Sequence, residues 1–148
     1  CRYMLHLEQI WQEVQRDGLH RMPFCTRTRF NLVHLQDISE AAAIVIEDDA
    51  HVNAIYELGG PEALSQEDCA RIVSEEIGRP VRAETLPLDI FIARARTNGA
   101  PEPRLAVLEI MNRHYDTHGL HGNGNVLRWL LGREPRTFRD YVAELAAR

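Results

Sequence analysis

The spacing of apolar residues near the middle of the chain changes from that of a strand to that of a helix. Residues 30–35, FNLVHL, are mostly apolar and β-favouring, which is typical of a short strand. Asp37 is predicted to cap the helix that follows, because its carboxylate can accept hydrogen bonds from first-turn amides while Glu40 reaches back to the cap. The buried stripe of this helix is expected to contain Ile38, Ala41, Ala42 and Val45.

A second strand and helix are predicted directly afterwards. Residues 54–58, AIYEL, favour a strand, and Gly59-Gly60-Pro61 ends it. Ser65 is placed to cap the next helix, with Asp68 at the capping-box position. Gly78 suits the left-handed residue that follows a helix. The pattern therefore predicts the order strand, helix, strand, helix across the middle of the chain.

The remaining periodicity predicts further helices and one more strand. The helices are expected over residues 3–14, 89–96, 105–115, 126–131 and after Thr137, and the strand over 81–86. The predicted caps of the later helices are Asp89, Asn125 and Thr137. The helix over 105–115 is apolar on nearly all sides, so we expect it to be buried on more than one side. Such a helix would pack under a partner domain or line an apolar pocket.

Composition and charge exclude several classes of protein. A length of 148 residues suits one domain, and 45% hydrophobic with 26% charged residues is typical of a globular chain. The net charge of −5 disfavours a nucleic-acid partner, and no apolar run reaches the roughly 18 residues of a membrane helix. The three cysteines are odd in number and widely spaced, which favours reduced thiols in a cytoplasmic protein over a disulfide framework.

The patterns that could carry chemistry are incomplete. The chain contains no lysine, so it cannot form a Tyr-x-x-x-Lys pair. Gly122-Asn123-Gly124 is the only GxG sequence, and it does not predict a phosphate loop because no strand precedes it. His114, His118 and His121 approach the spacing of zinc ligands, but no Cys or Glu completes the set, and neighbouring glycines favour a mobile loop. Cys25 is expected to be a surface thiol. We predict no catalytic residue and no metal site.

Four motifs occur in a characteristic order. They are Val33–Ser39 (VHLQDIS), Tyr56–Ser65 (YELGGPEALS), Ile77–Val81 (IGRPV) and Leu131–Val142 (LGREPRTFRDYV). Together they resemble the C-terminal half of the NmrA-like branch of the atypical short-chain dehydrogenase/reductase superfamily, over nearly the whole chain. The resemblance implies an α/β fold, fragment-like in its α+β character, with few strands and about five to six helices. Residues 1–148 would form one substrate-side domain of an extended Rossmann-type fold, with the N-terminal dinucleotide-binding part absent.

The resemblance also implies which residues line a substrate cleft. The family sequence F-M-E-N, which follows the strand beside the nicotinamide, is here Tyr3-Met4-Leu5-His6. The imidazole of His34, near the end of a predicted strand, could accept a hydrogen bond from a ligand. The cleft residues implied are Tyr3, Met4, His6, Met22, Phe24 and His34. The alternative is structural: the start and core edge of a helix for the first three, and a packing histidine for His34.

Two functions remain open from the sequence. In the first, the chain is the substrate-side or lid domain of an NmrA-like NAD(P)-dependent oxidoreductase or redox sensor. NAD(P) is then expected for the complete protein, but this chain alone would bind no cofactor and would not catalyse hydride transfer. In the second, the chain is a stand-alone homodimeric module that binds a small ligand without catalysis, because exposed sheet edges and apolar faces favour pairing. A hydrolase or metal enzyme is disfavoured, since no serine elbow or ligand set is present.

Overall fold

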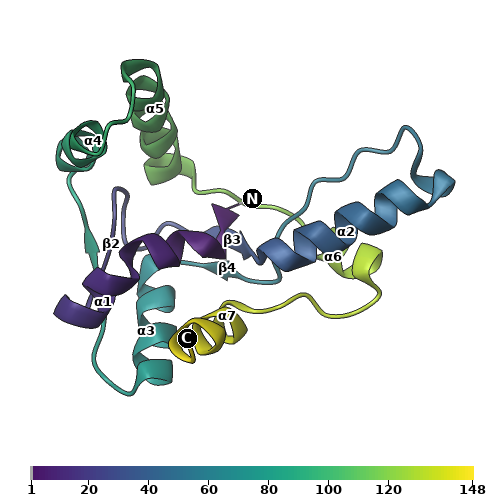
Figure 1. The fold of residues 1–148 in the computed structure, drawn as a ribbon, viewed down its shortest axis with the longest axis horizontal. Helices are drawn as coiled ribbons and strands as arrows, with labels where there is room; N and C mark the ends of the chain where they lie inside the picture. Colours follow the sequence, from purple (N-terminus) through teal and green to yellow (C-terminus); the bar gives the residue numbers. More distant parts are fainter. Residues whose placement is uncertain (1) are drawn as a thin grey trace.

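The computed structural model describes residues 2–148 as a central body with two helical arms (Figure 1). One arm is the hairpin of α4 (Leu88–Thr97) and α5 (Glu102–His118). The other pairs α2 (Leu35–Glu47) with α6 (Gly124–Leu131). The mixed α/β class is confirmed, and the seven α-helices of the described chain exceed the five to six expected.

The first sheet lies at the centre of the body and has the strand order β1-β3-β4. Strand β1 (Arg2–Tyr3) runs parallel to β3 (Phe30–Val33), with Arg2 opposite Leu32. Strand β4 (Ala63–Leu64) pairs with β3 in the antiparallel sense. All four residues of β3 are buried, which explains why this strand is a continuous run rather than an alternating one.

The second sheet pairs β2 (Leu19–Met22) with β5 (Arg82–Thr85) in parallel. Strand β5 confirms the strand predicted over 81–86. Strand β2 was not predicted. Its side chains do alternate, since His20 and Met22 are buried while their neighbours are half-buried. The sequence Leu19-His20-Arg21-Met22 does not alternate apolar and polar residues, so this period of two is visible only in the structure.

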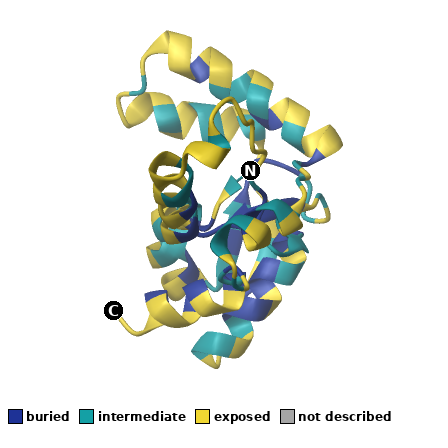
Figure 2. Cartoon of the chain, turned by 90° about the vertical axis from the view of Figure 1, so that its right-hand side faces the viewer, coloured by how far each residue is buried: buried dark blue, intermediate teal, exposed yellow. Residues whose placement is uncertain are grey.

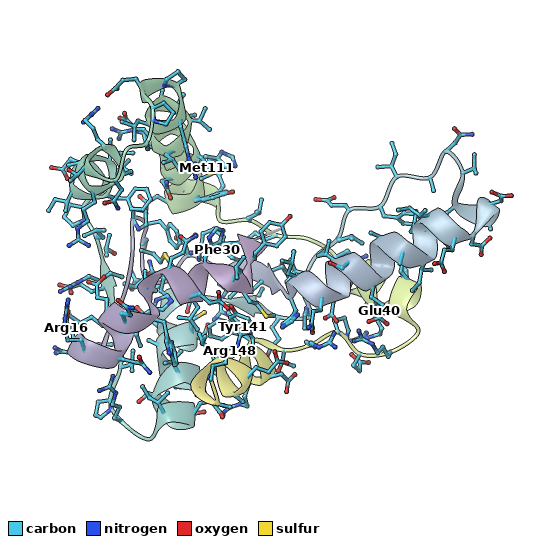
Figure 3. The ribbon with its side chains drawn as sticks, in the orientation of Figure 1. Arg16, Phe30, Glu40, Met111, Tyr141 and Arg148 are labelled. Carbon is cyan, nitrogen blue, oxygen red and sulfur yellow. The ribbon has the colours of Figure 1, made fainter. Side chains whose placement is uncertain are left out.

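Four helical segments cover these sheets. They are η1 (Met4–Ile10), α1 (Trp11–Asp17), α3 (Gln66–Ile77) and α7 (Phe138–Ala146). Helix α3 packs against α7 and both strands of the second sheet, and α7 also contacts η1. The helix predicted over 3–14 therefore exists, although its first part is a 3₁₀ helix. The main core, around Phe30 in Figure 3, includes Met4, Leu7, Val14, Val73, Phe138 and Val142.

The predicted caps Ser65 and Thr137 are confirmed, and each forms a capping box. The hydroxyl of Ser65 accepts a hydrogen bond from the amide of Asp68, whose carboxylate accepts one from the Ser65 amide. Thr137 and Asp140 make the same reciprocal pair at the start of α7. Gly78 ends α3 at φ +68°, the left-handed conformation expected there.

The arm of α4 and α5 is mostly exposed, as the yellow helices at the top of Figure 2 show. In α5 only Leu105 and Asn112 are buried, while Val107 and Ile110 are 62% and 70% exposed. The prediction of burial on more than one side is therefore wrong for the residues described, because α5 packs chiefly on α4. No helix within residues 2–148 combines the length and apolarity needed to cross a bilayer.

The strand predicted over residues 54–58 is wrong. These residues form no secondary structure, and Ile55 is 97% exposed. A strand requires a hydrogen-bonding neighbour, and β3 pairs instead with β4, which follows Gly59-Gly60-Pro61. The composition thus favours a strand, but the described chain offers this segment no partner.

Helix α2 starts earlier than predicted. His34 is its N-cap, and His34 Nδ1 accepts a hydrogen bond from the Gln36 amide 3.2 Å away. Asp37 therefore lies inside the first turn, where it binds arginines instead of capping, and Glu40 binds one of the same arginines. Ala42 is exposed, so the buried stripe of this helix is narrower than expected.

Two other predicted caps are also wrong. Asp89 lies within α4, whose N-cap position is Pro87 and has no side-chain hydrogen bond. Helix α6 is capped by Asn123 rather than Asn125, since the Asn123 side chain accepts from the Asn125 amide. Both errors are displacements of two residues, which is usual for a helix start inferred from residue spacing.

The turn at Gly59-Gly60 passes close to the first sheet. A Cβ on Gly60 would lie 1.6 Å from the carbonyl oxygen of Leu32, so only glycine fits there. The buried amide of Asn31 joins this turn to a second one, because it donates to the Gly60 carbonyl and accepts from the Gly122 amide. The close approach fixes both turns against β3.

Candidate functional site

A small pocket opens where β1 passes into η1. It is lined by Arg2, Tyr3, Met4, His6, Leu7, His20, Met22, Leu32, Cys69 and Phe138. Its cavity volume is about 10 Å³, which is room for about one water-sized group. Four of the six residues implied by the resemblance, Tyr3, Met4, His6 and Met22, lie together here.

Arg2 supplies the charge of the pocket. Its guanidinium carbon lies 5.0 Å from the ring centre of Phe24 and 5.4 Å from that of Phe30, within the range of cation–π attraction. One guanidinium nitrogen also lies 3.0 Å from the sulfur of Met22. Burial lowers the pKa of Arg2 to about 10, so the group remains charged at neutral pH. Within residues 2–148 it forms no ion pair with a carboxylate (the ion pairs involve other basic residues).

His20 supplies a neutral polar group beside Arg2. It is 3% exposed, and burial, followed by the charge on Arg2, lowers the pKa of His20 to about 4. Its Nδ1 atom is buried without a hydrogen-bond partner among the described residues. The side chain of Gln66 opposes part of this lowering of the His20 pKa. The Oε1 atom of Gln66 is likewise buried and has no hydrogen-bond partner among the described residues. Two polar groups at this place therefore retain unused hydrogen-bonding capacity.

His6 and Cys69 also line the pocket. Burial, followed by the charge on Arg2, lowers the pKa of His6, which is half-buried. Burial raises the pKa of the Cys69 thiol to about 12, so Cys69 is not a nucleophile at neutral pH. Among the described residues that line this pocket, Arg2 is therefore the one that carries a full charge at neutral pH.

The last two implied residues lie elsewhere. Phe24 is buried beneath Arg2 and packs against Phe30 with the ring centres 4.7 Å apart, so it supports the pocket without lining it. His34 caps α2 and lies edge-on to the ring of Tyr141, 5.4 Å between centres. The structure thus gives His34 a capping and packing position, away from the pocket.

The histidine-rich segment forms no metal site in the part of the chain that is described. No group of three or more potential ligands comes together there. His114 and His118 stack with ring centres 4.5 Å apart on the exposed end of α5. Cys25 is partly exposed, as expected, and a backbone hydrogen bond at Arg27 lowers the pKa of its thiol. It lies outside the pocket.

The sequence did not point to Arg2 or His20. Arg2 lies at the extreme start of the chain, where periodicity cannot be assessed, and His20 lies in the unpredicted strand β2. The sequence around His20 shows no alternation of apolar and polar residues, so it carried no signal that this histidine is buried. Chemically, the pocket offers a fixed positive charge and a neutral imidazole, which suit recognition of a polar group.

The chain is similar to proteins that use nicotinamide cofactors. No protein-family model matches it. It is 27% identical over 148 residues to an NAD(P)H azoreductase from Xenophilus azovorans, an alignment that covers 98% of this chain and 50% of that protein. The chain spans about half the length of the curated relatives it matches, including an uncharacterized oxidoreductase from Bacillus subtilis at 24% identity.

Solved structures show the same relation in three dimensions. The NADPH-dependent quinone oxidoreductase from Escherichia coli, complexed with NADPH, superposes with a TM-score of 0.83 at 21% identity over 98% of this chain and 51% of that one. The Citrobacter triphenylmethane reductase, complexed with NADP(H), gives 0.76 at 19% identity over 94% and 48%. These comparisons agree with the predicted resemblance: the chain has the fold of about half of each of these solved structures.

Proposed function

We propose that this chain forms the substrate-side half of an NAD(P)H-dependent reductase of small organic acceptors. The observation that carries the proposal is the pocket at the carboxyl end of β1, in a fold that matches half of several reductases. In sheets with parallel strands, ligands bind at the carboxyl ends of the strands. Tyr3, Met4 and His6 lie at this end and would contact the acceptor.

The dinucleotide would be held by polypeptide outside these residues. Gly122-Asn123-Gly124 does not fit a phosphate group, because Gly122 packs against the backbone of Gly59. A Cβ atom added to Gly59 would lie only 3.1–3.4 Å from the backbone atoms of Gly122. Asn31 further occupies the Gly122 amide. A nest that cradles phosphate needs free amides. The nicotinamide, when bound, would supply the hydride, and the residues of this chain would position the acceptor and exclude water from it.

The exposed segment 54–58 supports a covering partner. Ile55 and Tyr56 on this segment are 97% and 36% exposed, and Val52, two residues before it, is 65% exposed. The sequence favours a strand where the described chain provides no pairing partner. We propose that the dinucleotide-binding half supplies this partner. A homodimer that covers the same segment is the alternative.

A chimaera tests the function. The chain would be joined to the dinucleotide-binding half of the azoreductase relative, and NADPH binding and NADPH oxidation with quinone and azo acceptors would be measured. We expect saturable NADPH binding and acceptor-dependent oxidation by the chimaera, and neither by the 148-residue chain alone. Stoichiometric NADPH binding by the chain alone would contradict the proposal.

The oligomeric state of the chain alone separates the two possible partners. An Ile55→Asp variant places a charge on the exposed segment without altering the pocket, which does not include Ile55. If a homodimer covers the segment, the parent chain elutes as a dimer in gel filtration with light scattering and the variant as a monomer. If the dinucleotide-binding half covers it, the same substitution weakens the chimaera and leaves the chain alone monomeric.

A further inference from the structure

We propose that Arg2 receives a carboxylate oxygen of the substrate, so that the site selects apolar or aromatic molecules bearing a carboxylate. The proposal rests on the proposed function in one respect, namely that this pocket faces the acceptor. The observation behind it is a half-buried arginine that lines a cavity and has no carboxylate partner within residues 2–148.

The charge of Arg2 is only partly compensated by the chain. Charges withdrawn from water are normally paired, because complete burial of an ion costs several kcal/mol, and Arg2 is already half-buried. Here the guanidinium has the faces of Phe24 and Phe30 and the weak acceptor sulfur of Met22. These contacts use its faces and one N–H group, whereas guanidinium has five N–H donors. The remaining donors are available to an anionic oxygen.

The size and lining of the pocket limit the ligand. About 10 Å³ admits one oxygen atom and excludes a whole phosphate group. A planar carboxylate matches the planar guanidinium and can insert one oxygen. Most of the remaining lining is apolar, namely Met4, Leu7, Met22, Leu32 and Phe138. Tyr3, which is 41% exposed, lies at the open side and would contact an aromatic body.

His20 provides the second contact. Because its pKa is about 4, the ring is neutral at pH 7 and carries its proton on either nitrogen. The unpartnered Nδ1 can therefore donate to an incoming oxygen after a change of tautomer. An anion bound between Arg2 and His20 would also favour protonation of the ring, which gives a spectroscopic readout close to the ligand.

The test is a titration of the 148-residue chain with sodium benzoate, followed by NMR of the His20 ring and the Arg2 Nε–H. Benzamide, a neutral molecule of nearly the same shape, is the matched probe. We expect saturable shifts with benzoate and binding of benzamide weaker by about tenfold or more, the usual advantage of a charge-assisted hydrogen bond. Equal binding of the two probes, or no binding of benzoate, overturns the proposal.

Two variants localise the effect. Arg2→Met keeps an unbranched apolar stem against Phe24 and removes the charge, so it should lose the preference for benzoate. Arg16→Gln removes a surface arginine that pairs with Asp17 at 2.8 Å and should leave the preference unchanged. If Arg2→Met does not fold, Arg2→Lys takes its place. Lysine keeps the charge but lacks the planar pair of N–H donors of the guanidinium, so this variant should reduce the preference for benzoate over benzamide. The titration needs no cofactor, so a failure to bind benzoate does not contradict the reductase proposal. Equally, an inactive chimaera does not contradict the carboxylate site.

Discussion

Replacing Asp37 with asparagine should strongly destabilise the fold. The side chain of Asp37 is fully buried in the first turn of α2. Its carboxylate accepts hydrogen bonds from the Arg136 amide at 2.7 Å, from the Arg133 guanidinium at 2.8 Å and from the Arg136 guanidinium. The substitution removes the charge and turns one acceptor into a donor that faces guanidinium N–H groups.

The magnitude follows from the burial of the partners. Removing one member of a buried ion pair costs about 3–5 kcal/mol, because the remaining charge is left unpaired. Here both arginine side chains are about one-third exposed, at 35% and 32%, and can turn toward solvent. The loss in the free energy of unfolding should therefore lie at the lower end, about 3 kcal/mol. With a urea dependence of roughly 2 kcal/mol per molar, the midpoint falls by about 1.5 M.

The pH dependence gives an independent check. Burial alone would raise the pKa of Asp37, but the hydrogen bonds from Arg133 and Arg136 outweigh it and hold the pKa below 3.8. A carboxyl group whose folded pKa is depressed stabilises the fold above its unfolded pKa of about 3.9. That stabilisation disappears as the pH falls through the folded pKa. The difference between parent and Asp37→Asn should thus be constant near neutrality and shrink below about pH 4.

Urea unfolding at pH 7 and pH 3, followed by circular dichroism, measures both effects. Glu40→Gln is the matched control, since Glu40 binds Arg133 but is 44% exposed on α2 (Figure 3). An exposed pair of this kind contributes about 0–1 kcal/mol. If Asp37→Asn is no less stable than Glu40→Gln, or if its deficit is the same at both pH values, the reasoning is refuted.

Three further predictions use the same unfolding assay. Gly60→Ala should lower the free energy of unfolding by at least about 3 kcal/mol, because the new Cβ would lie 1.6 Å from a backbone carbonyl oxygen. Gly78→Ala meets nothing within 4 Å and should cost about 1 kcal/mol through its positive φ alone. Equal costs for the two variants would contradict this account. Thr137→Ala should cost about 1 kcal/mol by removing a helix cap, and Thr117→Ala, on the exposed face of α5, should cost less than half of that; a neutral Thr137→Ala would show that the capping box is dispensable. His20→Gln should reduce the loss of stability that occurs as the pH falls from 6.5 to 4. The buried His20 has a folded pKa of about 4, so over this range the histidine is protonated in the unfolded chain but not in the folded one, which favours unfolding. An unchanged pH profile would mean that His20 is not buried as a neutral ring.

Local hydrogen-bonding patterns were predictable, and this explains which helix starts were correct. Ser65 and Thr137 each have an aspartate three residues on, so both partners of the capping box are visible in the sequence. Asp37 has the same appearance, with Glu40 three residues on. Its carboxylate is taken instead by Arg133 and Arg136, nearly a hundred residues away. A local pattern cannot reveal such a competitor.

Burial by distant partners was the other limit of sequence analysis. Apolar periodicity shows that a face is apolar but not what covers it. Helix α5 and segment 54–58 both carry apolar residues that the described chain leaves exposed. The same limit applies to the candidate site. The resemblance indicated Tyr3, Met4, His6 and Met22, which line the pocket. It missed Arg2 and His20, whose importance depends on contacts with Phe24, Phe30 and Gln66 across the core.

The four sequence motifs are connected to one another or to the core by polar contacts. The first motif contains Asp37, which binds two arginines of the fourth. Glu62 of the second motif accepts a hydrogen bond from the Phe138 amide of the fourth at 3.4 Å. Arg79 of the third motif donates to the carbonyl oxygens of Val14 and Gln15, which end α1. These contacts anchor α2, α3 and α7 around the first sheet.

The residues that line the pocket have a different distribution. Only Phe138 of the described lining residues belongs to one of the four motifs, whereas Arg2, Tyr3, His6 and Met22 lie on β1, η1 and β2 outside them. The motifs by which the chain resembles reductases therefore mainly build the support, while residues outside them form most of the surface that would meet a ligand. It follows that proteins with similar motifs are expected to share the fold but not necessarily the substrate. Substitutions at Arg2, Tyr3 and His6 should accordingly alter ligand preference while leaving the free energy contributed by the motif contacts intact.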